Sequence, residues 1–388
     1  MRLFYFSGVT FPSSEPQAVH VIKMCEAFAK AGHEVILFAS GDPKSDPQKL
    51  FNSYNVEPNF TLSLEKTKKL PVLSRYKRLK TTSERMKRFG QPEMVYGRDP
   101  VALSAHAPAH IPVVFEATRM PTNKAEILAI SRLIKKPAFS GIVSVSDALK
   151  QALLKRFPAL RPEQIFVAHD AASVPRNISG KAPKSDEVKG RTDAFRVGYA
   201  GTLHQGKGVS MILKIAPMMP DCDFHVVGGT KTELAKLRRD NPPSNIVFYG
   251  HVPHAQVAGM LKGFDVVLAP YQHAALIKTG KNISRWISPM KVFEYMAAGR
   301  PVVASDLSIL REFLRHEENA LLVPAGDPMA WAEAIRRLRD DAELRKHLAQ
   351  NAFGELKNNF TWDKRAETVL DFAGGRKTSI LYASGKVA

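Results

Sequence analysis

Residues 288–305 read SPMKVFEYMAAGRPVVAS, the pattern of a capped helix followed by a buried strand. Ser288 is a favourable N-cap residue and Pro289 suits the first helical position, so the stretch predicts a helix over 289–298. The apolar run that follows is typical of a strand buried on both faces, here over 301–304. A helix that leads into such a strand indicates an α/β protein with a parallel sheet.

The predicted helix has one apolar face and one polar face. The apolar face carries Val292, Phe293 and Met296. Met290, Lys291 and Glu294 fall on roughly the opposite face, so we expect Glu294 to point away from the core. The free N–H groups of Met290 and Lys291 make the start of the helix a candidate anion site. The alternative is a solvent-exposed ion pair between Lys291 and Glu294.

A second segment has the order strand, glycine-rich turn, helix. Residues 195–201 (FRVGYAG) predict a strand, the loop TLHQGKG follows, and apolar residues at helical spacing predict a helix over 207–217. The glycines that let the backbone approach a phosphate are Gly201, Gly206 and Gly208. Lys207, at the entrance to the helix, adds a positive charge to this second candidate phosphate site.

This loop also has the spacing of a Walker A motif, except at its last position. Gly208 stands where that motif has the Ser or Thr that ligates Mg²⁺. A nucleoside triphosphatase and a purely structural glycine turn stay open as alternatives.

The loop TLHQGKG, which contains Lys207, and the helix 289–298, which contains the sequence FEYMA (the FEYMA helix), together resemble those of the family 4 retaining glycosyltransferases (glycosyl transferases group 1). The resemblance implies the GT-B architecture, an α/β fold of two Rossmann-like, doubly wound parallel-sheet domains facing a cleft. It implies that Glu294 holds the ribose of the donor nucleotide and that Lys207 binds its diphosphate. These two are the catalytic residues that the resemblance gives.

The length and the periodicity of the chain agree with two domains. With 388 residues, 44% of them hydrophobic, the chain is long enough for two cores. Further strands are expected at 3–6, 35–39, 94–96, 113–116, 142–145, 165–168, 224–227, 246–249, 266–269 and 321–323, and further helices at 19–31, 328–338 and 341–352. The polar segment 181–193 predicts a linker between an N-terminal, acceptor-side Rossmann-like domain (1–180) and a C-terminal, nucleotide-sugar-binding one (194–365). The resemblance implies that the tail 366–388 returns to the N-terminal domain.

Ligands of open parallel sheets gather at the carboxyl ends of the strands. The loops at this edge of the second sheet supply Gly228, Gly229, His251, Val252 and Tyr271 as donor-pocket candidates. The resemblance adds Gly201, Thr202, Gly206, Ser288, Met290 and Lys291 to the donor-binding residues. For any single position an ordinary strand-to-helix turn is the alternative.

In the first domain, Arg98 and Arg119 follow predicted strands, and with Thr118 they are the acceptor-side candidates. A structural ion pair is the alternative for each arginine.

The sequence departs from the family pattern at several positions. The departures are Trp286 in place of a carboxylate eight residues before Glu294, Thr202 in place of a basic residue, Thr118 in place of a histidine, and Glu15-Pro16 in place of a double glycine. A second hypothesis is therefore a catalytically weak, nucleotide-sugar-binding scaffold or regulatory subunit. Hydrolysis of the donor would distinguish it from an enzyme.

We expect no metal and no cofactor, because the nucleotide-sugar is a co-substrate and the resemblance implies metal-independent transfer with retention. Asp221 and Asp223 precede a predicted strand, at the amino end of the sheet, and are expected in a solvated turn. The histidine pairs His106 with His110 and His251 with His254 are each interrupted by proline and have no acidic or cysteine partner close in sequence.

The formal charge of +19 and the pI near 9.8 call for an anionic partner. Residues 66–88 hold ten Lys or Arg against one acid, Glu84, and their apolar residues recur at roughly three-residue spacing, which is typical of a basic amphipathic helix. Such a helix suits an anionic membrane surface, with a solvated charged helix as the alternative. A basic nucleic-acid-binding protein is the third hypothesis, but no recognition module accompanies the charge, so no nucleic acid is expected.

The two cysteines, Cys25 and Cys222, lie in apolar surroundings and are expected to be buried thiols, as in a reducing compartment. No run of 18 apolar residues occurs and the first strand is too short for a signal sequence. These features predict a cytoplasmic protein, peripheral at the inner face of the cytoplasmic membrane. By resemblance, its acceptor is a cell-surface glycan or a lipid-linked glycan, as in polysaccharide or lipopolysaccharide biosynthesis.

Overall fold

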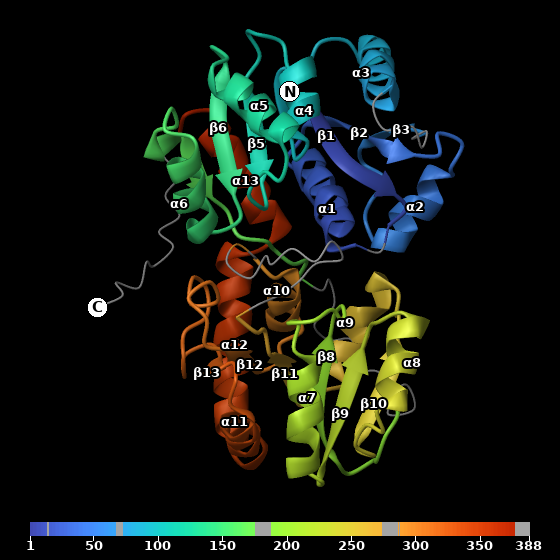
Figure 1. Cartoon of the computed structure of the whole chain (residues 1–388), viewed down its shortest axis with the longest axis vertical. Helices are drawn as coiled ribbons and strands as arrows, with labels where there is room; N and C mark the ends of the chain where they lie inside the picture. The colour runs from blue at the N-terminus through green and yellow to red at the C-terminus, as the bar shows by residue number, and fades with distance from the viewer. Residues whose placement is uncertain (14, 67–72, 175–187, 274–285, 287, 377–388) are drawn as a thin grey trace. The chain divides into compact units, whose positions relative to one another are not determined.

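The computed structural model describes residues 1–388 except 14, 67–72, 175–187, 274–285, 287 and 377–388. The chain forms two compact units (Figure 1). One comprises Met1–His169 and a return segment that begins at Trp362, and the other comprises Asp170–Thr361. The chain passes from the first unit to the second after His169, earlier than the expected linker 181–193. Part of that linker, 181–187, lies outside the described residues. The chain returns to the first unit at Trp362, four residues before the expected tail.

The first unit is built on a seven-stranded sheet in the order β3-β2-β1-β4-β5-β6-β7, with every pair parallel. Its strands are β1 (Arg2–Phe11), β2 (Glu34–Gly41), β3 (Thr61–Glu65), β4 (Met94–Gly97), β5 (Val113–Ala117), β6 (Phe139–Ser144) and β7 (Ile165–Val167). Its helices are α1 (Pro16–Lys30), α2 (Pro47–Tyr54), α3 (Leu73–Met86), α4 (Pro100–His106), α5 (Lys124–Ile134), α6 (Asp147–Arg156) and α13 (Trp362–Ala373). The strand order reverses between β1 and β4, which is where ligands of doubly wound sheets bind.

The second unit repeats this plan with a six-stranded parallel sheet in the order β10-β9-β8-β11-β12-β13. Its strands are β8 (Phe195–Ala200), β9 (Cys222–Val227), β10 (Ile246–Gly250), β11 (Val266–Ala269), β12 (Val302–Ser305) and β13 (Leu321–Val323). Its helices are α7 (Val209–Ile215), α8 (Lys231–Arg239), α9 (His254–Lys262), α10 (Met290–Ala297), α11 (Pro328–Asp340) and α12 (Ala342–Asn359). Here the order reverses between β8 and β11. The predicted parallel, doubly wound sheets are therefore confirmed in both units.

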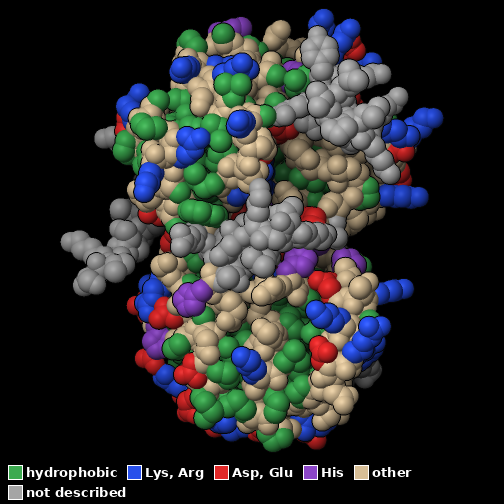
Figure 2. Space-filling view, viewed as in Figure 1, with side chains coloured by type: hydrophobic (Ala, Val, Ile, Leu, Met, Phe, Trp, Pro, Cys, Tyr) green, Lys and Arg blue, Asp and Glu red, His purple; other side chains and the backbone are tan. Residues whose placement is uncertain are grey.

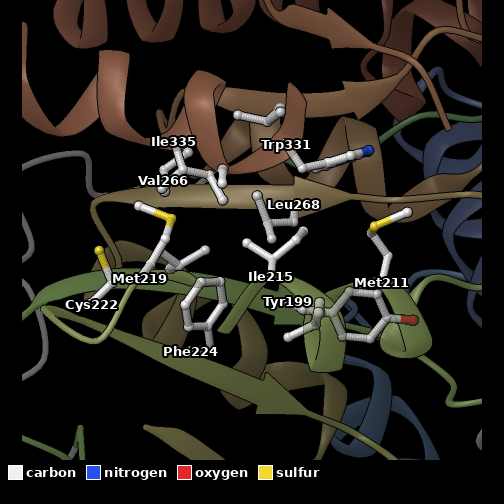
Figure 3. Packing of buried hydrophobic residues seen from close by; sticks show 14 of the residues in the cluster. Tyr199, Met211, Ile215, Met219, Cys222, Phe224, Val266, Leu268, Trp331 and Ile335 are labelled. Carbon is white, nitrogen blue, oxygen red and sulfur yellow. The ribbon is translucent and has the colours of Figure 1, made fainter. Parts of the chain in front are cut away.

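The core of the second unit fills the space between the sheet and the helices α7 and α11. In Figure 3 the side chain of Ile215 of α7 lies beside Leu268 of β11. Trp331 and Ile335 of α11 belong to the same cluster. All four side chains are essentially inaccessible to solvent. This packing fixes α7, and with it the loop that leads from β8 into α7.

A buried charge cluster joins the return helix α13 to the first sheet. Arg365 Nη2 donates a 2.7 Å hydrogen bond to Glu116 Oε1 at the carboxyl end of β5, and Arg365 Nε donates to the carbonyl oxygen of His169 at 2.8 Å. The ring nitrogen Nε2 of His20 on α1 lies 2.7 Å from the same carboxylate oxygen. Burial opposes the ionisation of Glu116, but Arg365, His20 and Arg98 outweigh it and hold its pKa well below the usual value. The helix α13 thus belongs to the first unit through an ion pair as well as apolar packing.

One expectation about a polar segment needs correction, and one strand was missed. Asp223 is not in a solvated turn: it lies inside β9 with 3% of its surface exposed, and its carboxylate accepts three hydrogen bonds from the N–H, Nε and Nη2 groups of Arg191. Strand β3 was not predicted, because its sequence TLSLE is partly polar and it lies at the edge of the sheet, where only one neighbour is needed.

Candidate functional site

The candidate site lies at the reversal point of the second sheet, where β8 and β11 end side by side. The loop after β8 contains Gly201, Gly206 and Gly208, with φ angles of +155°, +81° and +110°. Helix α7 begins at Val209, so Lys207 lies in the loop and not in the first turn of the helix as predicted. The order strand, glycine-rich loop, helix is otherwise confirmed.

Close contacts hold this loop against its neighbours. A Cβ atom added to Gly228, after β9, would stand 2.0 Å from the carbonyl oxygen of Gly201, and one added to Gly208 would stand 2.4 Å from the carbonyl oxygen of Pro270. A Cβ added to Gly229 would likewise collide with the side chain of Leu203. These glycines therefore let the loops after β8, β9 and β11 meet backbone to backbone at one edge of the sheet.

The helix that carries Glu294 is confirmed, with two corrections at its start. Pro289, not Ser288, is the N-cap residue of α10, and the hydroxyl of Ser288 instead accepts a 2.7 Å hydrogen bond from the N–H group of Asp170. Met290 is 9% exposed, so it belongs to the buried side of the helix. Buried Ser288 therefore joins the segment before α10 to Asp170.

Lys291 points inward, between two tyrosine rings. Its Nζ atom lies 4.0 Å from the ring centre of Tyr199 and 4.6 Å from that of Tyr271. Lys207 approaches the Tyr271 ring as well, with its Nζ atom 5.1 Å from the ring centre. Two lysines from different segments therefore meet over Tyr271, a buried residue that follows β11.

The two amines are held in a poorly solvated site. Burial lowers the pKa of Lys207 to about 8. Burial and the charge of Lys207 both lower the pKa of Lys291 well below its usual value, and Glu294 opposes this only in part. Burial also keeps the hydroxyls of Tyr199 and Tyr271 protonated by raising their pKa.

Glu294 is partly exposed, as predicted, but its partner is not Lys291. Its Oε1 atom lies 2.8 Å from Nε2 of His254, the first residue of α9. The alternative of a solvent-exposed pair between Lys291 and Glu294 is therefore wrong. The next residue of α10, Tyr295, receives a 2.8 Å hydrogen bond from the N–H of Ala200 and donates a 3.0 Å bond to its carbonyl oxygen, which ties α10 to the end of β8.

The remaining donor-side candidates lie on the same edge with less definite contacts. His251 is exposed and Val252 is partly exposed, directly after β10. The carbonyl oxygen of Thr202 accepts a 2.7 Å hydrogen bond from the Tyr199 hydroxyl, so Thr202 orients the ring on which Lys291 stacks. Tyr199 was not predicted from the sequence, and His254 was weighed there only as a metal ligand.

The acceptor-side candidates of the first unit have separate surroundings. Arg98 follows β4 at the reversal point of the first sheet, and its Nη1 atom is buried without a hydrogen-bond partner in the described part of the chain. Arg119 makes an exposed ion pair with Glu126, with N–O distances of 2.9 and 3.0 Å, so the alternative of a structural ion pair holds for it. Thr118 lies beside it, partly exposed.

The basic segment 66–88 is helical over its second part, as α3. A hollow of about 430 Å³ lies beside it, with Leu50, Leu62 and Leu64 in its lining and Arg85 and Arg88 among its basic residues. Arg85 makes an ion pair with Glu65, with 3.1 Å between Nη1 and Oε2, whereas Arg88 and Lys87 are exposed. Figure 2 shows Lys and Arg side chains spread over the visible face of the first unit.

Outside the segments left undescribed, no three His, Cys, Asp or Glu residues are grouped so as to hold a metal ion, and no helix is long and apolar enough to cross a membrane. Both cysteines are free and buried, as predicted.

Comparison with known families identifies the chain. Residues 194–341 match the profile of the glycosyl transferases group 1, and residues 17–171 match that of the Glycosyltransferase Family 4. The chain belongs to the family 4 glycosyltransferases. The resemblance seen in the loop and the FEYMA helix is thereby confirmed, and the two profiles together span most of this family 4 glycosyltransferase.

Relatives of this glycosyltransferase match it over nearly its whole length. It is 25% identical over 375 residues to a phosphatidyl-myo-inositol mannosyltransferase of Mycobacterium leprae, covering 90% of each chain. The protein of the same name from Mycolicibacterium smegmatis is 27% identical over 367 residues, which cover 88% of this chain and 86% of the relative. Among solved structures, Anabaena HepE in complex with UDP superposes with a TM-score of 0.73 at 14% identity, covering 97% of this chain and all of that one. This likeness confirms the GT-B type of fold.

Proposed function

We propose that this glycosyltransferase moves a sugar from a nucleoside diphosphate to a glycan or glycolipid acceptor, with retention and without a metal ion. The observation that carries the proposal is the meeting of Lys207 and Lys291 over Tyr271 at the reversal point of the second sheet. One buried amine and one partly buried amine at the carboxyl edge of a parallel sheet suit a ligand with two adjacent phosphates. Similar solved structures are complexes with UDP and with UDP-glucose, which supports a nucleotide-sugar as donor.

In the proposed reaction, the bond between the anomeric carbon and the diphosphate oxygen breaks, and the acceptor oxygen bonds to that carbon. The proton of the acceptor hydroxyl passes to an oxygen of the departing diphosphate. Lys207 and Lys291 stabilise the negative charge that grows on this diphosphate, the task that a metal ion performs in other transferases. Glu294 accepts hydrogen bonds from the ribose hydroxyls, and His254 keeps its carboxylate in place at 2.8 Å.

The test is calorimetric titration of the protein with UDP, GDP and ADP in the absence of divalent metal. We expect one of the three to bind, and Lys207→Ala to weaken this binding at least tenfold, about 1.4 kcal/mol. Lys214→Ala is the matched control, because Lys214 is exposed on the neighbouring helix α7. Absence of binding, or equal binding by Lys207→Ala, would refute the diphosphate site.

Transfer is tested separately from binding, because Trp286 stands where the family has a carboxylate. We expect release of the nucleoside diphosphate from the matching nucleotide-sugar, by hydrolysis or by transfer. Binding without any turnover would favour the nucleotide-sugar-binding scaffold instead.

We further propose that the acceptor is reached at an anionic membrane surface through the basic segment that contains α3. The exposed Lys80, Lys87 and Arg88 and the hollow beside the helix support this. The protein should then act at the inner, cytoplasmic face of the membrane. Co-sedimentation with vesicles that contain anionic lipid, but not with neutral vesicles, is expected, and Lys87→Glu with Arg88→Glu should reduce it. Equal binding to both kinds of vesicle would contradict this role.

A further inference from the structure

Lys291 presents an unusual group, a buried amine without a hydrogen-bond partner. Its Nζ atom is inaccessible to solvent and makes no hydrogen bond with any described residue. A charged ammonium has three N–H donors, and leaving them unbonded in a buried site is strongly unfavourable. The ring faces of Tyr199 and Tyr271 compensate for only part of this loss.

The second amine makes full protonation of the empty site still less favourable. Lys207 shares the Tyr271 ring with Lys291, so two positive charges would face each other in poorly solvated surroundings. Among the described residues, the titratable groups around the pair are Tyr199 of β8, Tyr271 after β11, Glu294 and Tyr295 of α10, His254 of α9, and Asp170. Glu294 is the carboxylate that acts on Lys291, and His254 occupies one of its oxygens.

The glycine loop after β8 packs directly against the amine. A Cβ atom added to Gly201 would stand only 3.2 Å from Lys291 Nζ, so a side chain at this position would crowd the amine. Gly201 belongs to the loop that also carries Lys207. Both amines therefore lie beside the same glycine-rich loop.

We propose that binding of a nucleoside diphosphate draws about one proton from solvent onto the Lys207–Lys291 pair, so that Lys291 becomes charged only when the donor is present. The inference rests on the proposed function. The diphosphate, with at least two negative charges, supplies the hydrogen-bond acceptors that the buried ammonium lacks. Its attraction to each lysine outweighs the repulsion between the two lysines. The lowered pKa values of Lys291 and Lys207 agree with an empty site in which the two amines are not both charged. The two amines titrate as one coupled system.

The test measures the proton count directly. Calorimetric titration with UDP, or with GDP or ADP if that is the nucleotide that binds, is carried out at pH 7.5 in two buffers of different ionisation enthalpy, Tris and HEPES. The dependence of the observed enthalpy on the buffer gives the number of protons taken up. We expect uptake of about one proton by the wild type and of nearly none by Lys291→Met.

The pH dependence of affinity gives a second readout. Between pH 7 and pH 8, Kd should rise up to about tenfold for the wild type and less than about twofold for Lys291→Met. Lys214→Met, on the exposed side of α7, should behave as the wild type in both measurements. If Lys291→Met folds poorly, the buffer dependence of the wild type alone decides the question.

The outcomes separate the two proposals. Binding without proton uptake, or equal uptake by the wild type and Lys291→Met, would overturn this inference and leave the proposed function intact. No binding of any of the three nucleotides by the wild type would overturn both.

Discussion

Replacing Glu116 by glutamine is predicted to destabilise the first unit severely. The Glu116 side chain is fully buried, and its Oε1 atom lies 2.7 Å from both Arg365 Nη2 and His20 Nε2. Glutamine has nearly the same shape but no charge, so it leaves the guanidinium of Arg365, 2% exposed, without a counter-charge. Breaking a buried ion pair in this way costs about 3–5 kcal/mol.

The assay is urea unfolding, with hydrogen exchange used to locate the effect. With a slope of about 2 kcal/mol per M, the midpoint of the first unit should fall by about 1.5–2.5 M. Amide protection should fall most in α13 and α1, the helices that carry Arg365 and His20. Glu126→Gln is the matched control, since Glu126 pairs with an exposed arginine in the same unit and should cost at most about 1 kcal/mol.

The effect should also depend on pH, with a definite sign. The pKa of Glu116 is depressed in the folded protein, so its ion pairs contribute stability above the ordinary carboxyl pKa of 4.5. That contribution is lost as pH falls from this value through the folded pKa, and the difference between wild type and Glu116→Gln should shrink over the same range. Equal midpoints for Glu116→Gln and Glu126→Gln at pH 7 would refute the reasoning.

Further predictions concern the second unit and the thiols. Gly228→Ala should lower the urea midpoint of unfolding and weaken nucleotide binding, because its Cβ would collide with the carbonyl oxygen of Gly201. Gly354→Ala, with nothing near its Cβ, should instead raise the free energy of unfolding by up to about 1 kcal/mol. Ser288→Ala should cost about 1–3 kcal/mol in urea unfolding, since it leaves the N–H of Asp170 without its acceptor; an unchanged midpoint would show that water replaces the hydroxyl. Neither Cys25 nor Cys222 should react with a thiol reagent at pH 8 until the protein is unfolded, because both are buried and burial raises the pKa of Cys222 to about 11; rapid labelling of the folded protein would contradict this.

Local patterns allowed much of the candidate site to be predicted. The glycines and the lysine of the loop after β8 are adjacent in sequence, and the apolar spacing of α10 already placed Glu294 on the partly exposed side. These features depend on a few neighbouring residues, so one sequence is enough to recognise them. The parallel strands other than β3 were predictable for the same reason, since each contains a short apolar run.

Contacts between distant segments were not predictable in this way. A helical wheel puts Lys291 on the same face as Glu294, but Tyr199 of β8 and Tyr271 after β11 enclose its amine. His254 reaches Glu294 across 40 positions of sequence, and Arg365 reaches Glu116 across 249. Asp223 was misjudged because β9 begins two residues earlier than expected and Arg191 supplies its partner. In each case the partner is set by the topology of the sheet.

The discontinuity of the first unit has a consequence for synthesis on the ribosome. Glu116 emerges 249 residues before Arg365, which at about 5–20 residues per second is a delay of roughly 12–50 s. The second unit, Asp170–Thr361, is translated entirely within that interval. The nascent chain therefore has an uninterrupted opportunity to fold its second unit first, while the buried charge cluster of the first unit still lacks Arg365.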